Sequence, residues 1–278
     1  MQASKPTEHP PTPLIPAPLI EATPEPGIAS IVLDRPAFRN SLTLATLEAL
    51  HAAIERAGAN ADIKAIVLSA HGPVFCAGHD LKEIVAHRAD ADHGRAFYSL
   101  VMATCARLMH AITTCPKPVI AAVQGTATAA GCQLVATCDL AVAGDDANFC
   151  TPGVNIGLFC STPMVALTRN ISRKHAMEML LLGELIDARQ AAAWGLVNRV
   201  VPAADVREAA LSMARQIASK SALTVRIGKR TFYDQIERPV ADAYDLAARV
   251  MVDNLLARDS IEGISAFVEK RAPQWPND

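Results

Sequence analysis

Two short segments carry residues whose types and spacing could do chemistry: FCAGHDLKE at residues 75–83 and ATAAGCQL at residues 127–134. Each follows a β-rich run and places small residues ahead of a predicted helix start. Gly78 permits a tight turn, which would point the amide of His79 outward near a helix N-terminus. The amide of Ala130 would lie at the start of a second helix. Two such N–H groups converging on one point would hold an oxyanion, aided by the helix dipole.

Small residues at strand-to-helix turns often serve close packing alone, so the elements that position these segments matter. Predicted strands alternate with predicted helices as far as residue 160, which favours an α/β fold over a bundle or a sandwich. Beyond that point the pattern is mostly helical, and everything from Ala203 onward is predicted to be helix. The predicted strands lie at 27–36, 63–72, 117–125, 140–144 and 196–201.

Three helices have definable limits in the sequence. Leucine and isoleucine recur at helical spacing over 44–54, with Asn40 or Ser41 as the expected cap. A longer helix is predicted over 93–114, and the run RKHAMEMLLLG ends on Gly183, the expected C-terminal cap.

Composition excludes several classes of function. The 278 residues are 51% hydrophobic and 19% charged, which is typical of a globular protein with one large domain. A net charge of -2 without a basic cluster argues against nucleic acid or an anionic membrane as the main partner. No apolar run approaches the ~20 residues that cross a bilayer, so no membrane span is expected.

The cysteines and the N-terminal segment bear on location. Seven cysteines, an odd number in mostly apolar surroundings, predict reduced buried thiols and no metal site. Residues 1–26 are crowded with proline and are expected to form a flexible tail. Lys5 is the only lysine or arginine of this tail, which lacks the pattern of a secretory signal or a mitochondrial presequence. A cytoplasmic location is therefore expected.

The motifs together are far more specific than either segment alone. In their order and spacing the chain resembles the enoyl-CoA hydratase/isomerase (crotonase) superfamily, from about Gly27 to the C-terminus. The resemblance rests on LDRP…RNSL, FCAGHDLKEI, CPKPVIAAVQGTATAAGCQLVATCDLAVA, FCTPGVNIGLFCS, LLLGELIDARQAAAWGLVNRVV and EGISAFVEKR.

This resemblance implies a fold and an assembly. The fold would be the α/β crotonase (ClpP/crotonase-like) spiral of β-β-α units over residues 27–202. Residues 203–278 would form a helical C-terminal region of the same domain, which drives trimerisation. The expected assembly is a homotrimer, or a hexamer made from two trimers.

The resemblance also implies a ligand and its contacts. Family members bind acyl-CoA thioesters as substrates without a tightly bound cofactor, and the N–H groups of His79 and Ala130 would hold the thioester carbonyl. The family usually has glycine at the position of Ala130. Phe267 and Lys270 would reach the adenine of a neighbouring subunit's ligand, although the first could be simple core and the second a solvated helix end. The remaining implied CoA contacts are Cys76, Ala77, Gly78, Asp80, Leu81 and Lys82.

Two departures from the family pattern put ordinary hydratase activity in doubt. Family hydratases use two glutamates to hold and activate a water, and their positions are occupied here by Gln133 and Gly153. Glutamine does not exchange protons near neutral pH, and glycine has no side chain. Because losing one acid–base group typically costs about 10²–10⁴-fold, losing both should make hydration very slow.

Three hypotheses follow. An enzyme could carry its proton-transfer group elsewhere. It could also be completed by bicarbonate, which Gln133 and backbone N–H groups would hold in a notch left by Gly153. A non-catalytic acyl-CoA carrier or regulator would keep the thioester cradle without the chemistry. A structural oligomer with no ligand is disfavoured, because the two close-approach loops would then have no use. The candidate proton-transfer side chains are His79, Asp80 and Glu83, with Cys132, Cys150, Asn155 and Cys160 as weaker candidates.

Overall fold

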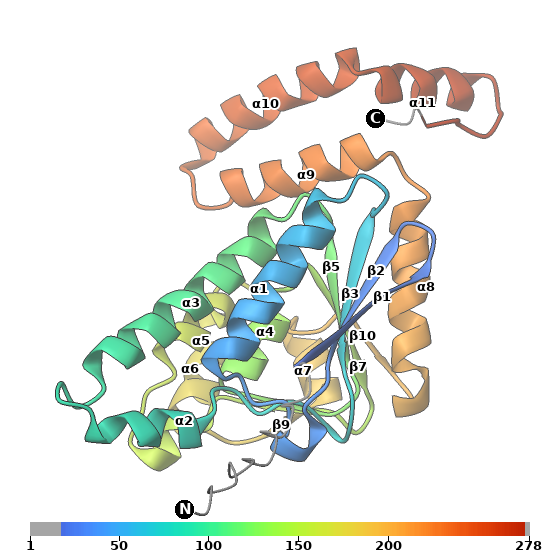
Figure 1. Cartoon of the computed structure of the whole chain (residues 1–278). Helices are drawn as coiled ribbons and strands as arrows, with labels where there is room; N and C mark the ends of the chain where they lie inside the picture. The colour runs from blue at the N-terminus through green and yellow to red at the C-terminus, as the bar shows by residue number, and fades with distance from the viewer. Residues whose placement is uncertain (1–17, 276–278) are drawn as a thin grey trace, which may run out of the picture.

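A six-stranded sheet forms the centre of the chain. The computed structural model describes residues 18–275. The strand order is β1-β2-β3-β5-β7-β10, in which β1 runs antiparallel to β2 and the other neighbours are parallel. Figure 1 shows α1 and α3 on one side of this sheet and α8 on the other. The strands are β1 (Leu19–Glu25), β2 (Ile28–Leu33), β3 (Ala65–Ala70), β5 (Val119–Val123), β7 (Leu140–Gly144) and β10 (Arg199–Val201).

A smaller sheet takes the second strand of each repeating unit. The chain passes from β3 to β4, from β5 to β6 and from β7 to β8, and a helix follows each pair. This repetition confirms the expected β-β-α architecture. Neighbours are parallel except for the antiparallel pair β8 and β9. The strands are β4 (Val74–Cys76), β6 (Thr126–Thr128), β8 (Asn148–Cys150) and β9 (Ile186–Asp187), in the order β4-β6-β8-β9.

Helices cover the sheets and then make up the C-terminal region, as predicted. The helices up to α7 are α1 (Leu44–Ala59), α2 (Leu81–Ala86), α3 (Arg95–Thr114), α4 (Ala130–Thr137), α5 (Ser161–Leu167), α6 (Arg173–Leu182) and α7 (Ala188–Trp194). The later ones are α8 (Val206–Ala218), α9 (Ala222–Gln235), α10 (Val240–Leu256) and α11 (Arg258–Val268). Short 3-10 turns lie at Pro36–Phe38, His87–Ala89, Pro152–Ile156 and Ala203–Asp205.

The core divides along the faces of the large sheet because successive strand residues point to opposite sides. In β3, Ile66 and Leu68 join the cluster that packs under α1 and α3. Val67 faces the other way and joins a smaller cluster with Ala210 and Ala214 of α8. Both faces of β3 are therefore covered, which explains why its sequence is apolar except for Ser69 rather than alternating.

Two sequence-based expectations are wrong at the N-terminal end. The flexible tail was expected through residue 26, yet Leu19–Glu25 forms β1 and pairs with β2. Ion pairs from Arg56 to Glu21 and from Arg215 to Glu25 hold this strand against α1 and α8. The cap of α1 is Thr43, whose side chain accepts a hydrogen bond from the Thr46 amide, and not Asn40 or Ser41. Residues 1–17 of the expected tail lie outside the described residues.

A buried ion pair joins α9 to the core. Lys229 Nζ lies 2.6 Å from Asp139 Oδ2 and also donates to the carbonyls of Ile112 and Lys117. The Tyr233 hydroxyl donates to the second Asp139 oxygen at 3.0 Å. The contact satisfies carbonyl groups at the end of α3, which otherwise have no partner within the helix. Beyond α9 the chain leaves the core, and α10 has no buried residue.

The predicted C-terminal cap of α6 is confirmed. Gly183 ends this helix in the left-handed conformation, with φ of 64°.

Candidate oxyanion site

The two predicted loops meet at the ends of adjacent parallel strands, β4 and β6. Gly78 has φ of +85°, and a Cβ atom placed on it would lie 3.0 Å from the Ala129 Cβ and 3.1 Å from the Ala130 nitrogen. Only glycine combines this backbone conformation with so close an approach. Gly131 is equally constrained, since its Cβ would lie 2.1 Å from the Cys76 carbonyl oxygen. The loops therefore touch through their backbones.

A backbone bridge fixes the direction of the His79 amide. Leu42 and His79 form an isolated parallel bridge, in which the Leu42 N–H donates to the Gly78 carbonyl at 2.8 Å. The Asp80 N–H donates to the Leu42 carbonyl at 3.1 Å. In a parallel bridge, one residue bonds to the peptide groups of the two residues that flank its partner. The partner's own N–H and C=O then face the opposite way. The His79 N–H accordingly points away from Leu42.

The Ala130 amide lies at the N-terminus of α4, where N–H groups have no partner within the helix. The preceding residue, Ala129, has φ of 50° and ψ of -118°, a conformation that is costly for any residue except glycine. Its N–H donates to the Cys150 carbonyl at 2.9 Å, which anchors the turn to β8. The sequence marked Ala129 only as one of three small residues in this segment and did not predict its strained conformation.

The two ring nitrogens of His79 are buried. Neither ring nitrogen reaches a hydrogen-bond partner among residues 18–275. Burial lowers the pKa of His79 below its ordinary value, and a nearby backbone group of Leu42 only partly opposes this. Desolvation disfavours the charged imidazolium, so the ring is neutral near pH 7 and keeps one donor and one acceptor nitrogen.

The two positions of the absent glutamates are both buried. Gln133 is 4% exposed, and the Cys105 thiol lies 4.0 Å from its side-chain oxygen. One of the three hypotheses places an anion in a notch left by Gly153, and the surroundings of Gly153 do not favour it. A Cβ atom on Gly153 would lie 2.9 Å from both the Cys160 sulfur and the Leu158 carbonyl oxygen. The space that the first side-chain atom of residue 153 would need is therefore already occupied by residues 158–160.

Two acidic candidates for proton transfer already have structural partners. Asp80 caps α2 by accepting from the Lys82 and Glu83 amides, and its second oxygen accepts from the Ser41 hydroxyl. Burial raises the pKa of Asp80, but these hydrogen bonds outweigh it and the net shift is downward. Glu83 accepts a hydrogen bond from the Leu44 amide at 3.0 Å. Both carboxylates therefore tie α2 to the start of α1.

The remaining candidates are also poorly suited to proton transfer. Burial raises the pKa of the Cys132 and Cys160 thiols, and that of Cys150 to about 11, so all three stay protonated near neutral pH. The Asn155 amide donates to the Gly183 carbonyl.

The residues implied for CoA fall into three environments. Cys76 is fully buried, and burial raises the pKa of its thiol to about 12. Leu81 and Lys82 are exposed at the start of α2. Phe267 is 84% exposed, so it is not simple core, and Lys270 is exposed two residues past α11. Figure 1 places α11 at the end of the molecule remote from α2. Within a single chain, Phe267 and Lys270 therefore lie far from the loop that leads into α2.

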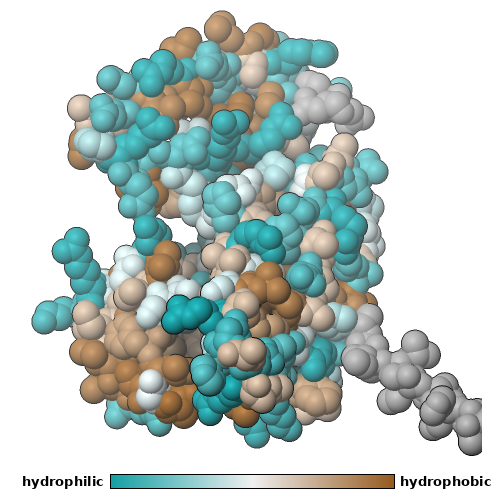
Figure 2. All heavy atoms as spheres, turned by 60° about the vertical axis from the view of Figure 1, so that its left-hand side comes forward, coloured by the Kyte–Doolittle hydropathy of each residue, from teal (hydrophilic) through white to brown (hydrophobic). Residues whose placement is uncertain are grey.

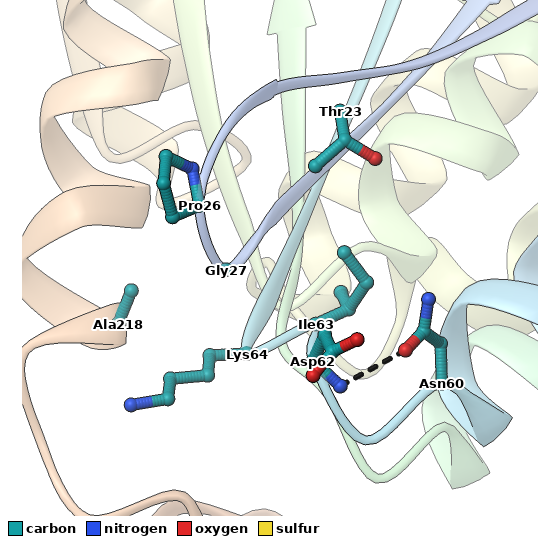
Figure 3. Close-up of a pocket in the computed structure, with 8 residues that line it drawn as sticks. All are labelled: Thr23, Pro26, Gly27, Asn60, Asp62, Ile63, Lys64 and Ala218. Atoms are coloured by element: carbon teal, nitrogen blue, oxygen red, sulfur yellow. Dashed lines mark hydrogen bonds between the residues drawn. The ribbon is translucent and has the colours of Figure 1, made fainter.

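A surface pocket elsewhere contains none of the predicted site residues. It has a volume of about 470 Å³ and lies between the β1–β2 turn, the loop before β3 and the end of α8. Figure 3 shows the Lys64 side chain extending from the loop before β3 toward Ala218, below Gly27. The two loops are therefore identified by their backbone geometry.

Residues 18–275 contain no cluster of three or more histidine, cysteine or acidic side chains arranged to hold a metal ion. Across the same residues, no helix has the length and apolarity that crossing a bilayer requires.

Comparison with known proteins identifies the family and supports the fold. A profile of the enoyl-CoA hydratase/isomerase family matches residues 23–278. The human protein named enoyl-CoA hydratase domain-containing protein 3, mitochondrial, is 50% identical over 252 residues, which are 91% of this chain and 82% of the relative. The crystal structure of that human protein superposes with a TM-score of 0.88 at 49% identity, covering 93% of this chain and 100% of the other. The crystal structure of an enoyl-CoA hydratase from Mycobacterium smegmatis gives a TM-score of 0.88 at 46% identity, with 93% and 98% covered. The name of the human relative places it in mitochondria, and the expected cytoplasmic location of this chain is not confirmed.

Proposed function

The chain belongs to the enoyl-CoA hydratase/isomerase family, and we propose that it binds acyl-CoA thioesters by holding the thioester carbonyl between two backbone N–H groups. The donors are those of His79 and Ala130. The observation that carries the proposal is the close approach of Gly78 to Ala130, where a Cβ on Gly78 would lie 3.1 Å from the Ala130 nitrogen, together with the bridge that turns the His79 N–H away from Leu42. Preorganised donors of this kind stabilise negative charge on a carbonyl oxygen.

Hydration by two carboxylates is not part of this proposal. Gln133 supplies no titrating group, and the Cβ direction of Gly153 is blocked by Cys160 and Leu158. The same blockage disfavours bicarbonate at that position. The protein would thus cradle and polarise a thioester without the water-activating pair of the family, which suits an acyl-CoA carrier or regulator.

A specific observation favours one catalytic alternative. Among the candidate acid–base groups, the His79 imidazole is neutral, buried and without a hydrogen-bond partner among residues 18–275. A neutral imidazole can accept a proton in the pH range where enzymes work. In this alternative, the carbonyl is held by the His79 backbone, and the ring of the same residue moves a proton beside it.

The C-terminal helices support a proposal about assembly. Large apolar side chains are exposed along α10 and α11, including Tyr244 at 75%, Leu256 at 74% and Val268 at 73%. Figure 2 shows hydrophobic residues on the helices at the top of the molecule and a second group low on the body. Such patches mark interaction surfaces in soluble proteins. We propose a homotrimer or a hexamer, in which Phe267 and Lys270 lie near a neighbouring subunit's ligand.

Two substitutions at one residue separate these functions. His79→Pro removes the backbone donor, whereas His79→Gln keeps that donor and removes the titrating ring. We would titrate each variant with acyl-CoA and follow loss of 2-enoyl-CoA thioesters with and without bicarbonate. The binding proposal predicts saturable binding that His79→Gln retains and His79→Pro weakens at least about tenfold. Turnover lost in both variants would favour the catalytic alternative. Equal binding by all three proteins would contradict the oxyanion site.

A further inference from the structure

The loop that precedes α1 forms a third wall behind the oxyanion site. The Ala77 N–H donates to the Arg39 carbonyl at 3.0 Å, and the Leu42–His79 bridge follows directly. Residues 39–42 therefore run alongside residues 77–80 like a short added strand. The orientation of the His79 N–H depends on where this loop lies, because the bridge determines which peptide groups face Leu42.

The loop adopts a costly backbone conformation. Arg39 and Asn40 have φ of 53° and 52°, two consecutive residues in the left-handed region. Left-handed residues other than glycine are disfavoured, although asparagine tolerates this conformation better than most. Two such residues in succession are stable only where contacts with the surrounding structure hold them in place.

Asn40 supplies those contacts. Its side chain is 1% exposed, and all three of its hydrogen bonds go to backbone. The Arg35 N–H donates to its oxygen at 2.8 Å, and its amide nitrogen donates to the carbonyls of His71 at 2.9 Å and Val74 at 2.8 Å. These acceptors flank the start of β4, the strand that leads into the His79 turn. One side chain thus joins the loop to the strand that carries the oxyanion donor.

We propose that Asn40 is a positioning residue for the His79 amide. It holds the left-handed turn and the start of β4 in register, so that the Leu42–His79 bridge aims the amide at the thioester carbonyl. This inference rests on the proposed acyl-CoA binding and assigns a role to a residue that sequence patterns suggested only as a helix cap.

Asn40→Asp tests the proposal with little change in size. Aspartate keeps the acceptor for Arg35 but replaces both amide donors with an oxygen that faces the His71 and Val74 carbonyls. Asn170→Asp is the control for the same chemical change at an exposed position. Asn170 also donates to two backbone carbonyls, those of Ala136 at 2.7 Å and Ala166 at 2.8 Å, but it lies at the other end of α4.

The readout is the affinity for an acyl-CoA thioester relative to the matched S-alkyl-CoA thioether, in which a methylene replaces the carbonyl. Two hydrogen bonds to the carbonyl should give the natural chain a thioester preference of about tenfold or more. Asn40→Asp should reduce this preference about three- to tenfold while the thioether affinity changes less than about twofold. Asn170→Asp should leave the preference unchanged. Equal losses of thioester and thioether affinity in Asn40→Asp, or an unchanged preference, would overturn the positioning role.

Amide hydrogen exchange tests the same role without ligand. Asn40→Asp should speed exchange at the Leu42 and Asp80 amides, the two donors of the bridge, at least about tenfold more than in the β2 and β3 amides. Unchanged exchange at both donors would overturn the proposal even if ligand binding fell. If the natural chain itself shows no thioester preference, the proposed acyl-CoA function fails instead, and exchange still decides whether Asn40 holds the bridge.

Discussion

At the scale of single residues, this site consists mainly of backbone, and side chains act by permitting or orienting it. Gly78 and Gly131 allow the two loops to touch, whereas Ala129 accepts a strained conformation to place the next amide at the start of α4. The two side-chain positions that define the family's hydration chemistry have moved into packing roles. Under the binding proposal, the cradle and the acid–base pair are separable, and this chain keeps only the cradle.

Ala129→Gly tests the strain at the oxyanion turn. A residue at φ 50° and ψ -118° carries about 1–3 kcal/mol of strain that glycine relieves, and the greater flexibility of unfolded glycine offsets about 0.5–1 kcal/mol. We expect the free energy of unfolding to rise by about 1 kcal/mol in urea titrations. Ala209→Gly, inside α8, should instead lower it by about 1 kcal/mol. A comparable loss from Ala129→Gly would contradict the strain argument.

The buried His79 ring should make stability depend on pH. Burial lowers its folded pKa below the unfolded value of about 6.5, so the unfolded chain binds the proton more readily. The contribution is present above pH of about 6.5 and is lost as pH falls from there through the folded pKa. Urea midpoints at pH 7.5 and pH 5 should differ less in His79→Gln than in the natural chain, whereas replacing the exposed His110 with Gln should leave the difference intact. Identical pH profiles for His79→Gln and the natural chain would rule this out.

At the scale of elements, short strands and turns decide what the loops can hold. The segment after β8 doubles back so that Cys160 and Leu158 fill the space in front of Gly153. A buried ion pair, Lys229 with Asp139, fastens α9 to the end of α3 and so sets the origin of the C-terminal helices. The second feature joins segments far apart in the sequence, since Lys229 and Asp139 are 90 residues apart.

Restoring the family's glutamates should not restore hydration. Gly153→Glu forces a side chain against Cys160 and Leu158, and overpacking of this kind typically costs about 1–3 kcal/mol. The double variant with Gln133→Glu should unfold at lower urea and show no gain in enoyl-CoA hydration. Gly228→Glu is the control, since a Cβ there meets nothing within 4 Å and glutamate favours the helix. Full hydratase activity in the double variant would contradict this prediction, because it would show that the segment after β8 moves to make room for the glutamate side chain introduced at position 153.

Removing Lys229 should destabilise the chain strongly. Lys229→Met leaves a buried carboxylate without its cation, which typically costs about 3–5 kcal/mol. Arg169→Met breaks the exposed pair with Glu237 and should cost about 1 kcal/mol or less. Thermal or urea unfolding distinguishes the two, and similar small losses in both would mean that solvent replaces the lost cation at Asp139.

At the scale of the whole molecule, the sequence predicts architecture better than local geometry. Alternating strand and helix patterns predicted an α/β fold, because hydrophobic periodicity reflects which faces the core covers, whereas the β-β-α repeat was implied by the family resemblance. Proline-rich composition hid β1, whose ion pairs to α1 and α8 no local pattern reveals. The Asn40 cap was misplaced because its amide bonds to residues 31 and 34 positions away. The crowding beside Gly153 could not be predicted either, because a glycine in the sequence does not indicate which residues pack against it.

The central claim is that two backbone N–H groups polarise a bound thioester carbonyl, and the vibration of that carbonyl tests it most directly. We would record the infrared difference spectrum of an acyl-CoA with a carbon-13 thioester carbonyl, free and bound. Polarisation by two donors should shift the C=O stretch to lower frequency in the natural chain and in His79→Gln, and most of the shift should disappear in His79→Pro. A bound thioester whose carbonyl absorbs at the frequency of the free ligand would contradict the account.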